Sequence, residues 1–138
     1  MIADRQPMAE AITLLQQDHE AMTAALQAAT ERYNEAFWEF YGAQVYAQVP
    51  TQSVVMDLGC GPGLFLRDVA TRYTPSALYG YDLTPAMIDH ARSLTYNGLP
   101  TTFAVHNLMA APLPVATGSM HVVNMTAVLH VLDNPLAV

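Results

Sequence analysis

Residues 54–63 read VVMDLGCGPG, a short apolar run that contains Asp57 and leads into three glycines at alternate positions. An apolar run of this length is typical of a buried β-strand. A glycine-rich loop that leaves a strand and enters a helix presents bare backbone N–H groups and the positive end of the helix to a ligand. Asp57 stands near the carboxyl end of the strand, where open α/β sheets bind their ligands. The stretch therefore predicts that a ligand approaches the backbone closely at the glycines.

The composition favours one globular domain that acts on a small molecule. The chain has 138 residues, of which 52% are hydrophobic, enough for one core. Twelve acidic residues face five arginines and no lysine, which gives a formal net charge of -7. Such a charge repels phosphate backbones and anionic membrane surfaces, so we expect no nucleic-acid or membrane partner. Because no apolar run approaches about 18 residues and Cys60 is the single cysteine, we predict a cytoplasmic protein.

The first part of the chain has a helical pattern. Residues 8–40 contain no proline or glycine, and apolar residues recur there at three-to-four spacing. Because this length exceeds that of a typical helix, we expect two helices with a break at Asn34 or Gly42. After Pro50 the pattern changes to strands that alternate with helices. This alternation is typical of βαβ units and of a parallel sheet buried on both faces.

The elements expected after the helical part define an α/β fold. Strands are predicted at residues 53–58, 77–83, 101–106 and 121–125, and a helix at residues 64–73. A second helix begins with Thr84 as its N-cap and Pro85 at its first position. The predicted architecture is a parallel sheet of about four strands flanked by helices, preceded by a helical segment.

The glycine loop differs from the motif that binds dinucleotides. That motif is G-x-G-x-x-G, whereas here Gly59, Gly61 and Gly63 alternate, and Pro62 removes one backbone donor. The preceding acid, Asp57, would face a pyrophosphate, but it suits a ligand that carries a cationic amino group. A nicotinamide oxidoreductase domain therefore remains only as a third alternative.

Residues 57–63, DLGCGPG, resemble the signature of the S-adenosylmethionine-dependent methyltransferases of the Rossmann-like (class I) family. Residues 79–92, YGYDLTPAMIDHAR, resemble the second strand of that family and the helix that follows it. Residues 103–108, FAVHNL, and residues 121–126, HVVNMT, resemble its third and fourth strands. The resemblance implies two parts: an N-terminal helical cap over residues 1–50, and a Rossmann-like S-adenosylmethionine-binding domain over residues 51–138.

The resemblance also implies a set of cofactor-binding residues. Asp82 would accept hydrogen bonds from both ribose hydroxyls, and Leu83 would pack on the adenine. Asn107 stands where the family usually has an acid that accepts from the adenine amino group, and an asparagine carbonyl can do the same. His121 replaces an acid that is common near the start of the fourth strand, so no role is carried over to it. The full set of cofactor-binding residues is Asp57, Gly59, Cys60, Gly61, Gly63, Asp82, Leu83, Asn107, Leu108 and Asn124.

Other residues are candidates for the substrate side of the site. His130 follows the fourth strand, where the family often places substrate contacts. The aromatic residues between positions 33 and 46 fit a helix core most simply, but Trp38 or one of the tyrosines can face a sulfonium cation. Cys60 fits as a small residue rather than as a nucleophile. No group of His, Cys, Asp and Glu has metal-ligand spacing, and no residue is assigned as catalytic.

The resemblance implies methyl transfer from S-adenosylmethionine to a small-molecule acceptor, with the rate coming mainly from positioning. The alternative is a non-catalytic S-adenosylmethionine-binding module or a partner subunit. In the family the sheet continues past a fourth strand, whereas this sequence stops at residues 133–138, DNPLAV, which have the pattern of a helix start. We therefore expect a fragment of a longer methyltransferase or a naturally short form. The unprotected fourth strand predicts a homo-oligomer or a partner chain that binds through residues 121–138.

Overall fold

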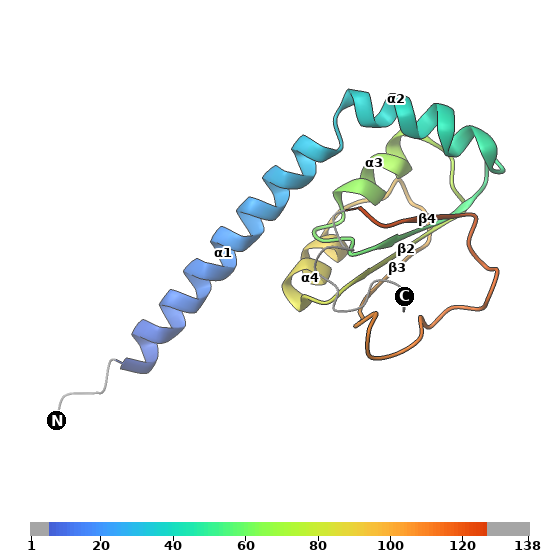
Figure 1. The fold of residues 1–138 in the computed structure, drawn as a ribbon. Coiled ribbons are helices and arrows are strands. Elements are labelled where there is room, and N and C mark those ends of the chain that lie inside the picture. Colours follow the sequence, from blue (N-terminus) through green and yellow to red (C-terminus); the bar gives the residue numbers. More distant parts are fainter. Residues whose placement is uncertain (1–5, 127–138) are drawn as a thin grey trace.

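In the computed structural model, which describes residues 6–126, four strands form one parallel sheet in the order β3-β2-β1-β4. The strands are β1 (Val54–Leu58), β2 (Ala77–Asp82), β3 (Thr101–Val105) and β4 (Val122–Asn124). The register places Asp57 of β1 between Gly80 of β2 and Asn124 of β4. The predicted α/β class is thereby confirmed, and the carboxyl ends of all four strands lie at one edge of the sheet (Figure 1).

The helices confirm the predicted order of elements. They are α1 (Gln6–Arg32), α2 (Glu35–Gln44), the short 3-10 helix η1 (Tyr46–Gln48), α3 (Leu64–Arg72) and α4 (Pro85–Ser93). The predicted break falls at Asn34, whose side-chain oxygen accepts from the backbone N–H of Phe37 and caps α2. Thr84 is the N-cap of α4 and Pro85 is its first residue, as predicted, although the Thr84 side chain makes no capping hydrogen bond. The carboxylate of Asp82 accepts from the backbone N–H of Thr84, at 3.0 Å, just before the helix.

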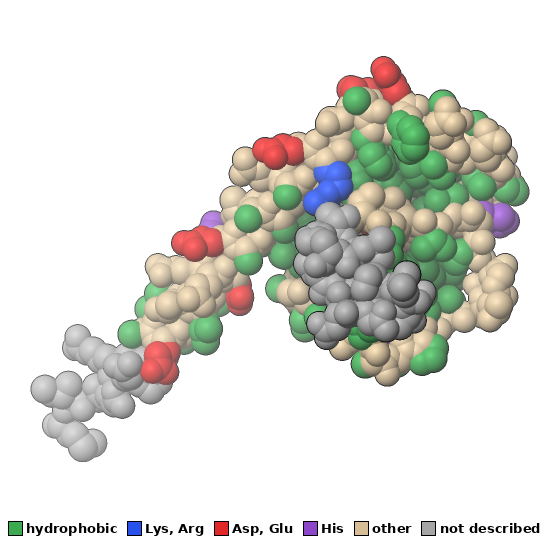
Figure 2. Space-filling model, in the orientation of Figure 1, with side chains coloured by type: hydrophobic (Ala, Val, Ile, Leu, Met, Phe, Trp, Pro, Cys, Tyr) green, Lys and Arg blue, Asp and Glu red, His purple; other side chains and the backbone are tan. Residues whose placement is uncertain are grey.

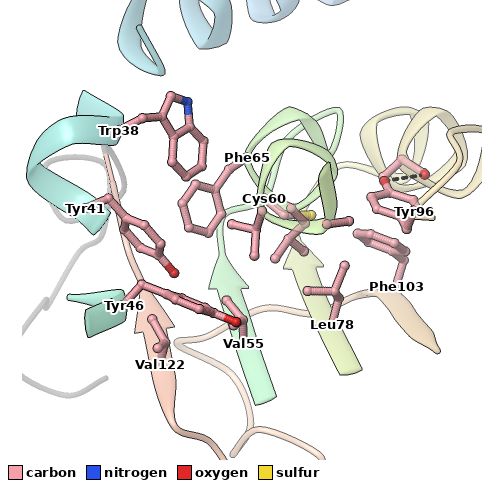
Figure 3. Packing of buried hydrophobic residues seen from close by; sticks show 14 of the residues in the cluster. Trp38, Tyr41, Tyr46, Val55, Cys60, Phe65, Leu78, Tyr96, Phe103 and Val122 are labelled. Atoms are coloured by element: carbon pink, nitrogen blue, oxygen red, sulfur yellow. Dashed lines mark hydrogen bonds between the residues drawn. The ribbon is translucent and has the colours of Figure 1, made fainter. Parts of the chain in front are cut away.

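Helices cover one face of the sheet. Alternate strand residues, among them Val55 and Leu78, point toward the helices and join the aromatic side chains of α2 and η1 (Figure 3). In this cluster the rings of Trp38 and Phe65 stack at 5.7 Å, and Tyr41 lies edge-on to Phe65 at 5.5 Å. The first helical segment and the sheet therefore share one hydrophobic core.

An irregular segment packs on the opposite face of the sheet. Met56, Leu58 and Tyr81 form a second buried cluster there. The residues that pack against them come mainly from the long connection between β3 and β4, including Leu108 and Met120. Within the described residues, helices thus lie on one face of the sheet, and the irregular connection between β3 and β4 lies on the other (Figure 1).

The long helix α1 touches the rest of the molecule through its carboxyl-terminal part. It projects away from the sheet in Figure 1, and Met8, Ile12 and Leu15 near its start are exposed. Ala29 near its end is buried, and α1 contacts α3 and α4. This packing brings the end of α1 close to the carboxyl ends of the strands.

Candidate functional site

Backbone and side-chain hydrogen bonds tie the glycine loop to the end of β2. The backbone N–H groups of Gly59 and Cys60 both donate to the carbonyl of Tyr81, at 2.7 and 3.0 Å. The N–H of Gly61 donates to Oδ2 of Asp82 at 2.9 Å. Asp82 therefore holds the loop in place, and each of its carboxylate oxygens keeps a further lone pair for a ligand.

Two of the loop glycines are needed for different physical reasons. Gly61 has a φ of 53°, and a Cβ built on it would meet nothing within 4 Å, so open space lies in front of its backbone. Gly63 has a φ of 91°, and a Cβ there would lie 2.5 Å from the hydroxyl of Tyr96 and 3.0 Å from Cβ of Ala91. Gly63 thus lets α3 begin close to α4, whereas Gly61 leaves room on the outer side of the loop.

Asp57 is a buried carboxylate with one oxygen left unsatisfied. Its exposed fraction is 1%, and Oδ1 accepts from the side-chain amide of Asn124 at 2.9 Å. Oδ2 is buried and has no hydrogen-bond partner among the described residues. Burial raises the pKa of Asp57 to about 7; the Asn124 hydrogen bond opposes the shift, and the nearby charge of Asp82 adds to it. Because an unpaired buried acceptor costs free energy, this oxygen is a candidate acceptor for a donor group of a ligand.

A chain of polar contacts connects Asp57 to the end of α1. Asn124 also donates to Oγ1 of Thr126 at 3.4 Å, and that hydroxyl shares a 2.5 Å hydrogen bond with the hydroxyl of Tyr33. Burial raises the pKa of Tyr33, and the negative charge of Asp57 raises it further. The guanidinium of Arg32 lies over the Tyr33 ring, 5.6 Å from its centre. The junction of α1 and α2 is therefore part of the wall around Asp57.

Sequence reasoning singled out some of these side chains and missed others. Tyr33 was among the aromatic candidates, and it is the one whose hydroxyl reaches the end of β4. Trp38 stacks on Phe65 in the core instead. Arg32 and Thr126 were missed, because the contact from Tyr33 to Thr126 spans 93 positions and leaves no local pattern. The only sequence signal for Arg32 was its position directly before Tyr33, and that signal is weak.

The predicted adenine side lies next to Asp82. The backbone N–H of His106 donates to the carbonyl of Asp82 at 2.9 Å, which holds the turn after β3 against the end of β2. Leu83 is 64% exposed, so its side chain is accessible to a ligand. The side-chain oxygen of Asn107 accepts from the backbone N–H of Met109 at 2.9 Å, and Leu108 packs in the second cluster. The geometry brings these residues together, and their contacts with adenine remain a prediction.

Of the remaining cysteine and histidine candidates, those that the structure describes have structural roles. Burial raises the pKa of the Cys60 thiol, which keeps it protonated and fits the interpretation of Cys60 as a small residue. His121 accepts through Nδ1 from the backbone N–H of Val54 at 2.8 Å, so it anchors the start of β1. His130 lies outside the described residues. Within residues 6–126, no group of three or more His, Cys, Asp or Glu side chains is placed to hold a metal ion.

The sequence matches a family model described as a methyltransferase domain, over residues 55–138. The chain belongs to this family. The resemblance to class I methyltransferases is thus confirmed, and the cofactor of the family is S-adenosylmethionine.

Curated relatives match over part of their length. The chain is 33% identical over 76 residues to a malonyl-[acyl-carrier protein] O-methyltransferase of Legionella pneumophila; the match covers 55% of this chain and 26% of that protein. It is 38% identical over 53 residues to a trans-aconitate 2-methyltransferase of Methylobacterium radiotolerans, over 37% of this chain and 20% of that protein. The matched part thus spans about a quarter or less of these relatives.

Solved structures share the fold. A chain from the complex of the Haloferax volcanii Trm112 methyltransferase activator with a methyltransferase has a TM-score of 0.64 at 23% identity, covering 88% of this chain and 50% of that one. A plantazolicin methyltransferase in complex with SAH has a TM-score of 0.56 at 18% identity, covering 95% and 46%. These similarities show the Rossmann-like methyltransferase fold.

Proposed function

We propose that this chain binds S-adenosylmethionine at the carboxyl ends of β1, β2 and β3 and transfers its methyl group to a small-molecule acceptor. Family membership supports the reaction. The single observation that carries the site is the unpaired buried Oδ2 of Asp57, which lies in the strand that leads into a loop with open space in front of Gly61. An acceptor of this kind fits the amino group of the cofactor, and open backbone fits its close approach. When bound, the cofactor supplies an electrophilic methyl group on a sulfonium.

The residues on the methionine side hold the amino group and shape the loop. Asp57 accepts a hydrogen bond from the amino group, and Asn124 orients Asp57 through its 2.9 Å contact. Gly59, Cys60 and Gly61 line the loop without placing a large side chain in the approach. Gly63 sets the start of α3, whose N-terminus faces the loop.

The residues on the nucleoside side bind the ribose and the adenine. Asp82 accepts from the ribose hydroxyls through the lone pairs that Gly61 and Thr84 leave free. Leu83, exposed in this structure, packs on the adenine, with Leu108 nearby. Asn107 accepts from the adenine amino group through its side-chain carbonyl or offers the neighbouring backbone. Because these groups position the cofactor rather than move protons, the chain contributes mainly alignment to the reaction.

The acceptor is a small molecule in this proposal. The named relatives act, by their names, on a malonyl-[acyl-carrier protein] and on trans-aconitate, which supports an acceptor other than a nucleic acid. The formal net charge of -7 disfavours nucleic acids and anionic membrane surfaces. Among residues 6–126, no helix is both long and apolar enough to cross a bilayer. We place the reaction in the cytoplasm.

Association belongs to the same proposal. Among the described strands β4 forms one edge of the sheet, and Val123 on it is 55% exposed. Edge strands with free backbone groups pair readily with other chains. We propose that residues 121–138, of which 127–138 lie outside the described residues, bind a second copy or a partner chain. This surface favours the second candidate, a cofactor-binding partner subunit, and a fold neighbour from a complex with an activator supports it. We also propose that residues 1–50 act as a cap on the domain formed by residues 51–138.

Product analysis separates these candidates. The chain is incubated with S-adenosylmethionine and a panel of carboxylic acids and acyl thioesters, and mass spectrometry follows methylated product and S-adenosylhomocysteine. Methyl transfer by the wild-type chain that is lost in Asp82→Ala supports the enzyme. Binding of S-adenosylhomocysteine without any product supports the partner subunit instead. Binding of a nicotinamide dinucleotide in place of S-adenosylhomocysteine would overturn the proposal.

A further inference from the structure

The charges around Asp57 leave half of a zwitterionic ligand without a partner. The amino-acid end of the proposed cofactor carries an ammonium and a carboxylate on the same carbon. Asp57 and Asp82 are both acidic, and the charge of Asp82 is felt at Asp57. These acids suit an ammonium and repel a carboxylate. A site that holds the whole amino-acid end therefore needs a cation nearby.

Arg32 is connected to this site through described contacts. It is the last residue of α1, it is exposed, and its guanidinium lies 5.6 Å from the centre of the Tyr33 ring. The Tyr33 hydroxyl in turn shares a hydrogen bond with Thr126, which contacts the same Asn124 amide that binds Asp57. Burial is the main cause of the raised pKa of Asp57, and the positive charge of Arg32 lowers this pKa. The charge of Arg32 therefore acts on the carboxyl group of Asp57.

The other arginines of residues 6–126 have partners of their own. Arg67 pairs with Asp68 at 3.4 Å, and Arg72 pairs with Glu35 at 2.8 Å. Arg92 donates to the carbonyl of Phe103. Arg32 differs from them, because its partner within residues 6–126 is the Tyr33 side chain and not a carboxylate or a carbonyl of that part of the chain. Figure 2 shows basic side-chain atoms on the surface where the long helix meets the body of the molecule.

We propose that Arg32 binds the carboxylate of the amino-acid end of S-adenosylmethionine, opposite Asp57, so that the site recognises the zwitterion rather than an amine alone. The inference rests on the proposed function and adds a ligand-binding residue to it. A guanidinium fits this role because its planar donors match both oxygens of a carboxylate. Tyr33 positions Arg32, since its ring supports the guanidinium and its hydroxyl is fixed by Thr126.

Binding of three ligands by calorimetry tests the proposal without any turnover. S-adenosylhomocysteine carries both charges, its decarboxylated analogue keeps only the ammonium, and methylthioadenosine lacks both. The wild-type chain should bind S-adenosylhomocysteine more tightly than the decarboxylated analogue. In Arg32→Gln the affinity for S-adenosylhomocysteine should fall roughly 10- to 150-fold, the range for hydrogen bonds to charged groups. The affinities for the decarboxylated analogue and for methylthioadenosine should not fall.

Matched variants separate a local effect from a general loss of charge. Arg67→Gln removes another exposed arginine that is paired on α3, and it should bind all three ligands like the wild type. Arg32→Lys keeps the positive charge but lacks the paired donors of the guanidinium, so it should recover part of the preference for the carboxylate that Arg32→Gln loses. Thermal melts confirm that each variant is folded.

The outcomes distinguish this inference from the function on which it rests. If the wild-type chain does not bind S-adenosylhomocysteine, both the proposed function and the inference are contradicted. If it binds, but Arg32→Gln keeps the full preference for the carboxylate-bearing ligand, only the role of Arg32 is overturned. An equal loss of affinity for all three ligands in Arg32→Gln would also overturn it.

Discussion

Replacing Asp57 by asparagine tests whether the buried carboxyl group destabilises the folded chain when it ionises, and whether a bound ligand offsets this cost. Burial raises the pKa of Asp57 from 3.8 to about 7. The folded chain holds the proton of the Asp57 carboxyl group more tightly than the unfolded chain does. The stabilisation of the folded state by this proton is therefore full below about pH 4 and is lost as the pH rises to about 7. Over about pH 5 to 8, the shift corresponds to a loss of about 2 to 3 kcal/mol in the free energy of unfolding. The Asp57→Asn variant would lack this titration, and its new amide would still offer a carbonyl to Asn124.

Urea unfolding of the wild-type chain and of Asp57→Asn at about pH 5 and pH 8 measures the difference. The wild type should lose about 2 to 3 kcal/mol more than the variant between these two conditions. Asp89→Asn, a change on the exposed side of α4, should follow the wild type. Binding of S-adenosylhomocysteine should ionise Asp57, so that calorimetry below about pH 7, in buffers of different ionisation enthalpy, detects proton release by the wild type but not by the variant. Identical pH dependence of unfolding in the wild type and Asp57→Asn would refute this account of the buried carboxyl.

The remaining predictions concern the loop and association. In Gly61→Ala the alanine must adopt a left-handed φ of 53°, but its Cβ meets no other atom, so the substitution should lower the free energy of unfolding by roughly 1 to 2 kcal/mol. The added methyl group stands in the open space in front of the loop, so calorimetry should show at least about tenfold weaker binding of S-adenosylhomocysteine. Gly63→Ala places Cβ 2.5 Å from the Tyr96 hydroxyl, and a thermal melt should show a much larger loss of stability than for Gly61→Ala; equal melting temperatures would contradict the division of roles. Light scattering after gel filtration should give a mass above that of the 15.0 kDa monomer, and a cooperatively melting monomer would contradict association through residues 121–138.

Local signals allowed the sheet and part of the site to be predicted. The apolar run before the glycines fixes β1, and the strand-end acids Asp57 and Asp82 follow from the alternation of strands and helices. The helix break at Asn34 could be predicted because asparagine is a good N-cap wherever a helix restarts. The N-cap position of Thr84 and Pro85 after it could be predicted in the same way, whereas the missing capping hydrogen bond of the Thr84 side chain could not.

Contacts between distant parts of the chain could not be predicted in this way. His121 accepts from the N–H of Val54 across 67 positions, and the Tyr33 hydroxyl meets Thr126 across 93. Neither pair leaves a periodic pattern or a fixed spacing in the sequence. The different constraints on Gly61 and Gly63 likewise depend on a third residue, Tyr96, that only the folded chain brings close.

Titration of the chain with S-adenosylhomocysteine, in the wild type and in Asp82→Ala, tests the central claim most directly. The account predicts one binding site per chain. In Asp82→Ala the affinity should fall roughly 10- to 150-fold, because the ribose hydroxyls lose a charged acceptor and the loop loses its anchor at Gly61. A folded wild-type chain that binds no S-adenosylhomocysteine, or a folded Asp82→Ala variant that binds it with unchanged affinity, would contradict the assignment of this site.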